Sequence, residues 1–492
     1  MSSERIHAPE LSGALDWFNV AAPLTLKSLR GKIVLLDFWT YGCVNCMHIL
    51  PDLKRLEAKY RDELVVIGVH SAKFANERKS ENIRHILVRY EIDHPVANDA
   101  AFAIWKAYGA RAWPTQVLID PEGYVVGTAS GEGHGDALDR AIAAVIHVFD
   151  EQGTIDRSPV SLSPERGRVA TSTLAYPGKV LADEGGGRLF IADSNHNRIL
   201  VATLDGRVTD VIGDGRAGYV DGPFEAVQFF RPQGMALDED KLYVADTGNH
   251  AIRVADLSAR RVSRVAGTGR QAAWGGQGGA ARETPLSSPW DAQLSGQLLF
   301  VAMAGSHQIW MIDLERRLAF PYAGSGREAR VDGSVDEAAF AQPSGVVLSG
   351  GKLFVADSES NIIREIDLPP TNRVRTLAGG DLFEFGDHDG TGDEVRLQHP
   401  LGLASNGGRL FIADTYNHRL KVLDPLTGRV QQFAGNGEAG LVDGSCSDAS
   451  FYEPGGLAAT TSALYVADTN NHAIRRVRLD RKIVETLVIT GI

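Results

Sequence analysis

Residues 33–46, Ile33-Val-Leu-Leu-Asp-Phe-Trp-Thr-Tyr-Gly-Cys-Val-Asn-Cys46, place two cysteines three residues apart where an apolar strand pattern gives way to a helical pattern. A helix N-terminus offers unpaired N–H groups and partial positive charge, which stabilise a thiolate. Only the thiolate attacks a disulfide at a useful rate. The spacing puts Cys46 about one turn from Cys43, within reach of a disulfide. The stretch therefore predicts a dithiol that opens and closes in redox chemistry.

The sequence around this stretch, from residue 1 to residue 150, alternates strand and helix patterns. The strand patterns cover residues 33–38, 64–69, 116–119 and 124–128, and the helical patterns cover roughly 44–61, 76–90, 100–108 and 135–149. The first two strand runs are almost continuously apolar, as buried parallel strands are. Residues 1–150 are therefore predicted to form an α/β domain, followed by a polar, proline-broken linker over 151–176.

The rest of the chain, residues 177–492, repeats one motif six times. Leu242-Tyr-Val-Ala-Asp246 is typical of the repeat, and consecutive copies lie 53, 57, 54, 57 and 54 residues apart. The final position of the motif falls at Asp193, Asp246, Met303, Asp357, Asp414 and Asp468. Each unit contains four short strand patterns punctuated by glycine, which is the signature of a propeller blade. The repeats predict an all-β, six-bladed propeller.

Composition narrows the class of protein. With 492 residues the chain is too long for one core, and its 43% hydrophobic and 23% charged residues are ordinary for a globular protein. The net charge of −12 argues against nucleic-acid or anionic-membrane binding. Three cysteines make no disulfide framework. No stretch resembles a signal peptide or approaches the ~18 apolar residues of a membrane span. We therefore expect a cytoplasmic protein with mostly reduced thiols.

Two resemblances follow from these motifs. The repeats resemble the NHL family, named for an Asn-His-Leu signature, at Asn249-His250, Asn417-His418 and Asn471-His472. The N-terminal domain resembles thioredoxin, and especially its TlpA-like branch, at Asp37, Trp39, Cys43, Cys46, Pro51, Pro114 and Thr115. Both domains in this order resemble the NHL-repeat-containing protein 2 family and its bacterial relatives.

The resemblance departs from thioredoxin at the dithiol itself. Gly42 stands where thioredoxins usually carry tryptophan, and Val44-Asn45 separates the cysteines in place of Gly-Pro. These positions tune the reduction potential and the binding of the substrate, so neither property is carried over from thioredoxin to this chain.

We interpret Cys43 as the nucleophile and Cys46 as the resolving thiol. Asp37 lies at the end of a buried strand, where a carboxyl has a raised pKa, and the resemblance implies that it takes a proton from the resolving thiol. The resemblance also implies a cis peptide between Trp113 and Pro114 that sets the backbone opposite the reactive sulfur. The substrate-binding residues expected on this basis are Trp113, Pro114, Thr115 and Trp39, with Tyr41 as a further candidate.

Each of these residues also has a plainer interpretation. The cysteines could be an inert core pair or half of a zinc site, although the chain has no second pair to complete one. Asp37 could be a hydrogen-bonded structural residue, Pro114 an ordinary trans turn, and the tryptophans simply core. Cys446 is isolated and is expected to be a spectator.

The propeller carries three further groups of polar residues. The repeat aspartates could bind calcium, but their repetition favours a structural role at strand-end turns. The equivalent histidines are expected to be structural for the same reason, and the arginines of the last repeat are expected to form a solvated basic face. These two sets are His250, His307, His418 and His472, and Arg475, Arg476, Arg478 and Arg481.

The function predicted from the sequence is thiol–disulfide exchange at Cys43 and Cys46, with the propeller as a binding platform for a protein or peptide. Its partners would be protein or small-molecule thiols and disulfides and an external reductant, with no cofactor, metal or nucleic acid. The alternative is a scaffold or redox sensor without turnover, built on the propeller. A propeller hydrolase or lyase with a channel metal ranks third.

Overall fold

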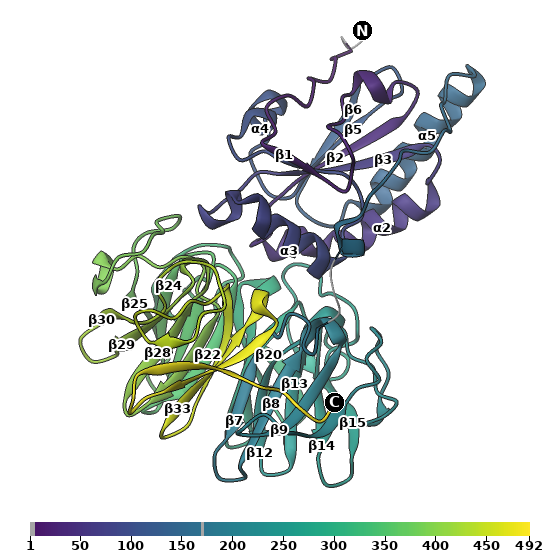
Figure 1. Ribbon diagram of the computed structural model, residues 1–492. Coiled ribbons are helices and arrows are strands. Elements are labelled where there is room, and N and C mark those ends of the chain that lie inside the picture. Colours follow the sequence, from purple (N-terminus) through teal and green to yellow (C-terminus); the bar gives the residue numbers. More distant parts are fainter. Residues whose placement is uncertain (1–4, 169–171) are drawn as a thin grey trace. The chain divides into compact units, whose positions relative to one another are not determined.

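The computed structural model describes residues 5–168 and 172–492, and the chain divides into two compact units within residues 1–171 and 172–492 (Figure 1). Each unit has its own hydrophobic core. The first is an α/β unit and the second a six-bladed propeller, as the sequence predicts.

One six-stranded sheet organises the first unit, in the order β1-β4-β3-β2-β5-β6. Its strands are β1 (Asp16–Phe18), β2 (Ile33–Trp39), β3 (Leu64–His70), β4 (Val96–Asn98), β5 (Thr115–Ile119) and β6 (Val125–Ser130). β3 pairs in parallel with both β2 and β4, and the other pairs are antiparallel. The helices are α1 (Val44–His48), α2 (Leu50–Lys59), α3 (Ser80–Tyr90), α4 (Ala103–Tyr108) and α5 (Gly135–Glu151), with short 3-10 turns η1 (Lys27–Leu29), η2 (Asn76–Arg78) and η3 (Glu165–Arg168).

Two details of this unit differ from the sequence prediction. The helix expected over 44–61 is two helices that meet at Ile49, because Pro51 has no N–H to donate to the carbonyl four residues earlier. The strands β1 and β4 were not predicted, because three residues are too few to show an alternating pattern.

Residues 151–168, which the sequence assigns to the linker, bond to the first unit. Asp156 donates its backbone N–H to Gly31 O at 2.9 Å, and the Lys32 ammonium donates to Ser158 O. Asn19 accepts the N–H of Ser163 at its carbonyl and the N–H of Glu165 at its side chain. This part of the segment therefore extends the α/β unit.

The second unit consists of six antiparallel sheets, one for each repeat. The four main strands of successive blades are β7 (Val180–Asp183), β8 (Arg188–Asp193), β9 (Arg198–Thr203) and β10 (Val208–Ile212); β12 (Pro232–Asp238), β13 (Lys241–Asp246), β14 (Ala251–Asp256) and β15 (Arg261–Ala266); β17 (Pro289–Ser295), β18 (Leu298–Met303), β19 (Gln308–Asp313) and β20 (Leu318–Ala323); β22 (Pro343–Ser349), β23 (Lys352–Asp357), β24 (Ile362–Asp367) and β25 (Arg373–Ala378); β27 (Gly402–Asn406), β28 (Arg409–Asp414), β29 (Arg419–Asp424) and β30 (Arg429–Ala434); and β32 (Pro454–Ala459), β33 (Ala463–Asp468), β34 (Ala473–Arg478) and β35 (Ile483–Leu487).

Short elements complete the blades. Two-residue strands flank the last five sheets: β11 (Gly222–Pro223), β16 (Gly279–Ala280), β21 (Gly333–Ser334), β26 (Gly390–Thr391) and β31 (Gly444–Ser445). The 3-10 turns are η4 (Ser194–His196), η5 (Thr247–Asn249), η6 (Ala304–Ser306), η7 (Gly392–Glu394), η8 (Thr415–Asn417) and η9 (Thr469–Asn471).

The first strand of each blade lines the centre of a closed ring, in which β32 of the last blade contacts β7 of the first. The chain end adds to this closure, because Thr490 accepts the N–H of Val208 at 2.8 Å and donates its own to Gly206 O. Lys179 crosses the centre of the ring to reach Asp291 at 3.3 Å and the carbonyls of Ser344 and Leu401.

The NHL histidines join neighbouring blades. Each adopts a left-handed backbone, and its Nδ1 accepts the N–H of the residue before the leading proline of the next blade. His250, His307, His418 and His472 accept in this way from Ser288, Gln342, Glu453 and Tyr176, at 3.0–3.2 Å. Asn197 and Asn361 do the same with side-chain oxygens in the remaining two blades. The bond between His472 and Tyr176 joins blade six to blade one.

Four of the repeat aspartates are held by buried cations seven residues later in the sequence, whereas Asp193 faces Arg198, five residues later, at 2.8 Å. Asp246, Asp357, Asp414 and Asp468 face Arg253, Arg364, Lys421 and Arg475, at 2.9, 3.3, 3.9 and 2.9 Å. Each aspartate also accepts a backbone N–H, for example that of Tyr452 on Asp468 at 2.7 Å. Their role is structural, but the partners are these cations and backbone groups, whereas the neighbouring Ser and Thr hydroxyls bond to the next blade, as Thr469 does to Pro177 O.

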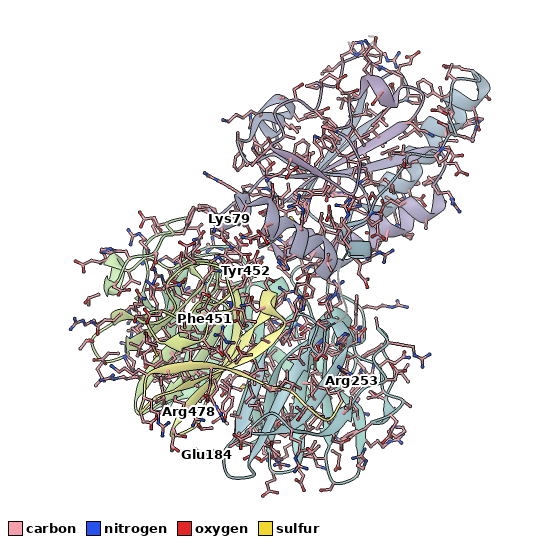
Figure 2. The ribbon with its side chains drawn as sticks, viewed as in Figure 1. Lys79, Glu184, Arg253, Phe451, Tyr452 and Arg478 are labelled. Atoms are coloured by element: carbon pink, nitrogen blue, oxygen red, sulfur yellow. The ribbon has the colours of Figure 1, made fainter. Side chains whose placement is uncertain are left out.

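The prediction of a solvated basic face in the last repeat is wrong for Arg475. Arg475 is 0% exposed and donates to Asp468, Asp443 and two backbone carbonyls. Figure 2 shows the equivalent Arg253 within the strands of the second blade and Arg478 toward the rim of the last. Asp468 lies only seven residues before Arg475, but Asp443 lies 32 residues before it, so the local sequence does not show that the two carboxylates meet at this guanidinium.

Blade three replaces the ion pair with two apolar side chains. Met303 stands at the aspartate position and Trp310 at the arginine position, and both are buried against Ala281 and Leu286. The same blade geometry therefore accepts either a charged or an apolar pair at this place.

Candidate functional site

The two cysteines of the predicted dithiol lie at the start of α1. Cys43 is the residue before the helix, and its carbonyl accepts the N–H groups of Cys46 and Met47 at 3.1 and 3.3 Å. Both side chains are free thiols, with Cys43 8% exposed and Cys46 1% exposed. Burial raises the pKa of the Cys46 thiol well above its usual range, and its hydrogen bond with Cys43 and the nearby Asp37 carboxylate add to that rise. Cys46 therefore needs a base before it can act as a nucleophile.

Asp37 provides a carboxyl group beside Cys46. It lies in β2, opposite Gly68 of β3 and Gln116 of β5, and is 1% exposed. Burial raises the pKa of Asp37 to about 6, while a hydrogen bond from Gln116 Nε2 at 3.2 Å and the charge of His94 act to lower it. A carboxyl with this pKa exchanges protons near neutral pH.

A buried glutamate fixes the loop between β2 and the dithiol. Glu77 accepts hydrogen bonds from Thr40 Oγ1 at 2.5 Å and from the Gly42 N–H at 2.9 Å. It also accepts the N–H groups of Lys73 and Phe74, at 2.7 and 3.0 Å. Four donors on one carboxylate hold the chain that leads into Cys43 in a single conformation.

The Trp113–Pro114 peptide is cis, as the thioredoxin resemblance implies. Pro114 accepts the N–H of Gly131 at its carbonyl, and Thr115 begins β5 beside Phe38. Trp113 donates its indole N–H to Ser71 O at 2.9 Å. These residues surround the end of β2, from which the dithiol loop departs.

Two aromatic candidates lie in the core of the unit. Trp39 is 2% exposed and packs edge-on against His70, with ring centres 4.9 Å apart. Tyr41 is also buried and stacks on the same His70 ring. Both side chains are therefore core residues of the unit, packed on the His70 ring.

The structure adds three residues to those named from the sequence: Gln116, Glu77 and His94. Gln116 was within reach of prediction, because antiparallel pairing of β5 with β2 places it opposite Asp37. Glu77 reaches the site from the 3-10 turn η2 and His94 from the loop before β4, both far away in the sequence, and they follow no local pattern.

Neither a metal site nor a membrane-spanning helix is found in the described part of the chain. Over residues 5–168 and 172–492, His, Cys, Asp and Glu side chains form no group of three or more that could hold a metal ion. Across the same ranges, the helices lack the combination of length and apolar character that crossing a bilayer requires.

Comparison with known proteins agrees with this architecture. Residues 31–125 match the Thioredoxin-like family, and residues 229–255 and 397–423 match the NHL repeat. The chain is 45% identical to protein SUPPRESSOR OF QUENCHING 1, chloroplastic, from Arabidopsis thaliana, over 96% of this chain and 47% of that protein. It is 42% identical to NHL repeat-containing protein 2 of Gallus gallus, over 99% of this chain and 72% of the relative.

A more distant match covers the first unit alone. Thiol-disulfide oxidoreductase ResA of Bacillus thuringiensis subsp. konkukian is 29% identical over 25% of this chain and 68% of its own length. The chain spans about half the length of the Arabidopsis relative and almost three quarters of the chicken relative. With both domains matched in the same order over nearly its whole length, the chain belongs to the NHL repeat-containing protein 2 family.

Proposed function

We propose that Cys43 and Cys46 carry out thiol–disulfide exchange, and that the propeller holds or selects the partner. The observation that carries this proposal is the placement of Asp37, a buried carboxyl with a pKa of about 6, beside a Cys46 thiol whose pKa is raised. The name of the relative ResA, a thiol-disulfide oxidoreductase, supports the same chemistry. The cytoplasmic location stays a prediction, since one relative is named as chloroplastic.

The reaction begins at Cys43, the more exposed of the two sulfurs. Its thiolate attacks one sulfur of a substrate disulfide, so that a mixed disulfide forms and the other substrate sulfur leaves as a thiolate. Cys46 gives its proton to Asp37, attacks Cys43 Sγ, and releases the second substrate sulfur. Two electrons pass from the dithiol to the substrate. An external dithiol restores the reduced pair by the reverse exchange.

Pro114, Thr115 and Trp113 are the proposed substrate-binding residues. Thr115 Oγ1 is occupied by Ala112 O and Ser130, so the peptide backbone around cis Pro114 is the part of this segment that we expect a substrate chain to meet. Trp39 is buried, so it takes part through its packing on His70 in the core and not by direct contact with a substrate.

The proposal is tested by trapping. In a Cys446→Ser background, Cys46→Ser should accumulate mixed disulfides with partners, because the attack on the substrate remains and the resolving step is lost. Cys43→Ser in the same background is the matched control and should trap nothing. A Cys46→Ser protein whose Cys43 reacts with an alkylating agent but captures no thiol partner would overturn turnover on such substrates.

The propeller's part in the proposal is tested in the same assay. Removing residues 172–492 from the Cys46→Ser protein should change which partners are captured if the propeller selects them. An unchanged set of partners would remove that role from the propeller.

A second candidate is a redox sensor or scaffold. Cys43 is 8% exposed and is preceded by Gly42 instead of an aromatic residue, which favours slow or restricted access to substrates. This candidate predicts a Cys43–Cys46 disulfide that forms and breaks reversibly without catalysing the reduction of a substrate. A disulfide-reductase assay over many turnovers separates the two.

A further inference from the structure

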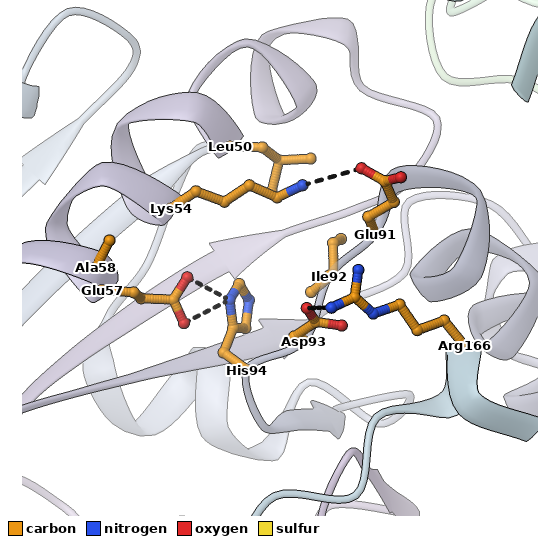
Figure 3. Close-up of a pocket in the computed structure, with 9 residues that line it drawn as sticks. All are labelled: Leu50, Lys54, Glu57, Ala58, Glu91, Ile92, Asp93, His94 and Arg166. Atoms are coloured by element: carbon orange, nitrogen blue, oxygen red, sulfur yellow. Dashed lines mark hydrogen bonds and ion pairs between the residues drawn. The ribbon is translucent and has the colours of Figure 1, made fainter. Parts of the chain in front are cut away.

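Two cavities in the first unit share one pair of side chains. The larger, of about 410 Å³, lies between α2 and the segment that follows α3 and is lined by Leu50, Lys54, Glu57, Ala58, Glu91, Ile92, Asp93, His94 and Arg166 (Figure 3). The smaller, of about 270 Å³, includes Lys32, Arg61, Asp62 and Ser158 in its wall. Glu57 and His94 line both. Solvent in either cavity therefore reaches the same two residues.

The His94 ring connects these cavities with the face of the sheet that carries Asp37. Its Nδ1 lies 3.4 Å from both carboxylate oxygens of Glu57, as Figure 3 shows. Its Nε2 is turned the other way, toward Gly68, where a side chain would meet it at 3.4 Å. Gly68 pairs in register with Asp37, and paired residues of neighbouring strands share one face of a sheet. The imidazole therefore separates the Asp37 face from the cavities.

Because Gly68 has no side chain, two further side chains, Trp39 and Val96, approach its Cα on the same face as His94. Trp39 Nε1 would lie 2.8 Å from a Cβ at this position, and it has no hydrogen-bond acceptor among residues 5–168 and 172–492. His94 Nε2 and Trp39 Nε1 therefore converge with Val96 Cγ2 above Gly68, the residue paired with Asp37, whose pKa the charge of His94 lowers. A water that bridges Asp37 to His94 Nε2 would have the Trp39 indole N–H as its third polar partner.

We infer that His94 and Glu57 form a relay that moves protons between Asp37 and the solvent of these two cavities. The relay rests on the proposed function, because it serves the resolving step. Asp37 takes the proton from Cys46 and passes it, through one water, to His94 Nε2. His94 releases its other proton from Nδ1 to Glu57, which gives it to solvent. Reduction of the disulfide runs the same path in reverse.

Other charged groups near His94 already have partners of their own. On its own loop Asp93 binds Arg166 at 2.7 Å, and at the end of α3 Glu91 lies 3.6 Å from Lys54 of α2. In the smaller cavity the Lys32 ammonium donates to two backbone carbonyls, and Arg61 lies 3.8 Å from Asp62. Among these groups, Glu57 is the carboxylate that faces the imidazole.

The structure offers a matched pair of variants for a test. Glu57→Gln removes the carboxylate that faces His94, and Glu91→Gln makes the same change in the same cavity at a residue that faces Lys54. His94→Gln removes the imidazole itself. Circular dichroism of each full-length protein, in a Cys446→Ser background, verifies the fold.

The first measurement follows the two sulfur steps separately. Mixing reduced protein with an aromatic disulfide that releases a coloured thiolate gives one release when Cys43 attacks and a second when Cys46 resolves. His94→Gln and Glu57→Gln should leave the first rate unchanged and slow the second on the order of tenfold at pH 7, which is less than the ~10²–10⁴-fold of a group that takes the proton directly, because Asp37 still accepts the proton of Cys46. Glu91→Gln should match the parent in both. Equal rates in all proteins, or equal slowing of both steps, would overturn the relay.

The second measurement needs no turnover. Carbon-13 NMR of the reduced protein titrates the Asp37 carboxyl directly. Because the charge of His94 lowers the pKa of Asp37, His94→Gln should move that titration upward, whereas Glu91→Gln should not. If the parent protein in the first measurement releases no second thiolate, the proposed thiol–disulfide exchange itself is overturned. An Asp37 pKa that is the same in the parent and in His94→Gln would overturn the relay, whatever the release rates.

Discussion

Asp37 in the α/β unit and Asp468 in the propeller are both fully buried, and burial raises the pKa of each to about 6. Their partners differ. Asp468 faces the Arg475 guanidinium at 2.9 Å and accepts from Asn471 and the Tyr452 N–H. Among the described side chains, Asp37 receives one hydrogen bond, from Gln116.

This difference separates a structural carboxylate from a reactive one. A buried acid with a full set of donors holds neighbouring strands together and loses several of these bonds when it takes up a proton, whereas an acid with one donor can exchange its proton at little cost to its surroundings. Burial and a raised pKa are shared by both residues, so neither property identifies the functional group. The partners do.

Asp468→Asn should have the largest effect on stability. It leaves the Arg475 guanidinium buried with only the half-exposed Asp443 as a charged partner, and breaking a buried pair from one side costs about 3–5 kcal/mol. Urea unfolding of the full chain measures the loss. Asp443→Asn, which changes the exposed partner, should cost about 1 kcal/mol or less. Equal losses in the two variants would mean that Asp468 is not what holds Arg475.

Asp37→Asn should shift stability in the opposite direction. Because the folded-state pKa of Asp37 is raised, its contribution to stability is fully present below about pH 4 and is lost as the pH rises through about 6. The neutral amide avoids this loss, so the variant should be more stable than the parent by about 2–3 kcal/mol at pH 8 and by little at pH 4. Unfolding at both pH values, with the dithiol reduced, tests the sign. A variant destabilised at pH 8 would place Asp37 with the structural aspartates.

The two units can be compared in isolation only if each keeps its full set of contacts. Residues 1–150 should fold alone, but residues 1–168 should be more stable by at least about 2 kcal/mol, since the added segment makes four hydrogen bonds to Gly31, Lys32 and Asn19, each with a net gain of at least ~0.5 kcal/mol. Thermal unfolding of the two fragments measures this difference. Identical midpoints would mean that the segment contributes nothing to the unit.

Gln116→Leu gives the smallest of the expected effects and tests the Asp37 environment most directly. The hydrogen bond from Gln116 lowers the pKa of Asp37, so its loss should raise that pKa above about 6 by up to about one unit, or ~1 kcal/mol. Carbon-13 NMR of the carboxyl follows the titration. Thr115→Val, at the neighbouring position on the opposite face of β5, should leave it unchanged.

The elements that the sequence predicted well are those with a strong period. The apolar runs that became β2 and β3, the helix start at Cys43 and the six copies of the propeller motif follow from local patterns. The sequence alone therefore predicts the six blades. It also predicts the chemistry expected of a dithiol beside a buried aspartate.

The rest of the site depends on contacts between residues far apart in sequence. Glu77 reaches the dithiol loop across 35 residues to Gly42, and His94 reaches the Asp37 face from the loop before a three-residue strand. In the propeller, the seven-residue spacing from Asp468 to Arg475 is visible in the sequence. The burial of Arg475 is not, because its second carboxylate partner, Asp443, lies 32 residues away. Charge alone therefore suggested a solvated face where the fold buries a cation.

The bonds between blade six and blade one change how the propeller is expected to lose its structure. A linear array of repeats has free ends, from which it can fray one unit at a time. Here Thr490 pairs with Gly206 and Val208, and His472 and Thr469 bond to the segment before β7, so no blade is terminal. Opening the ring exposes the apolar faces of two blades at once, and the six blades should therefore melt together in one cooperative transition. Joining ends almost 300 residues apart also makes this the slowest contact to form during folding.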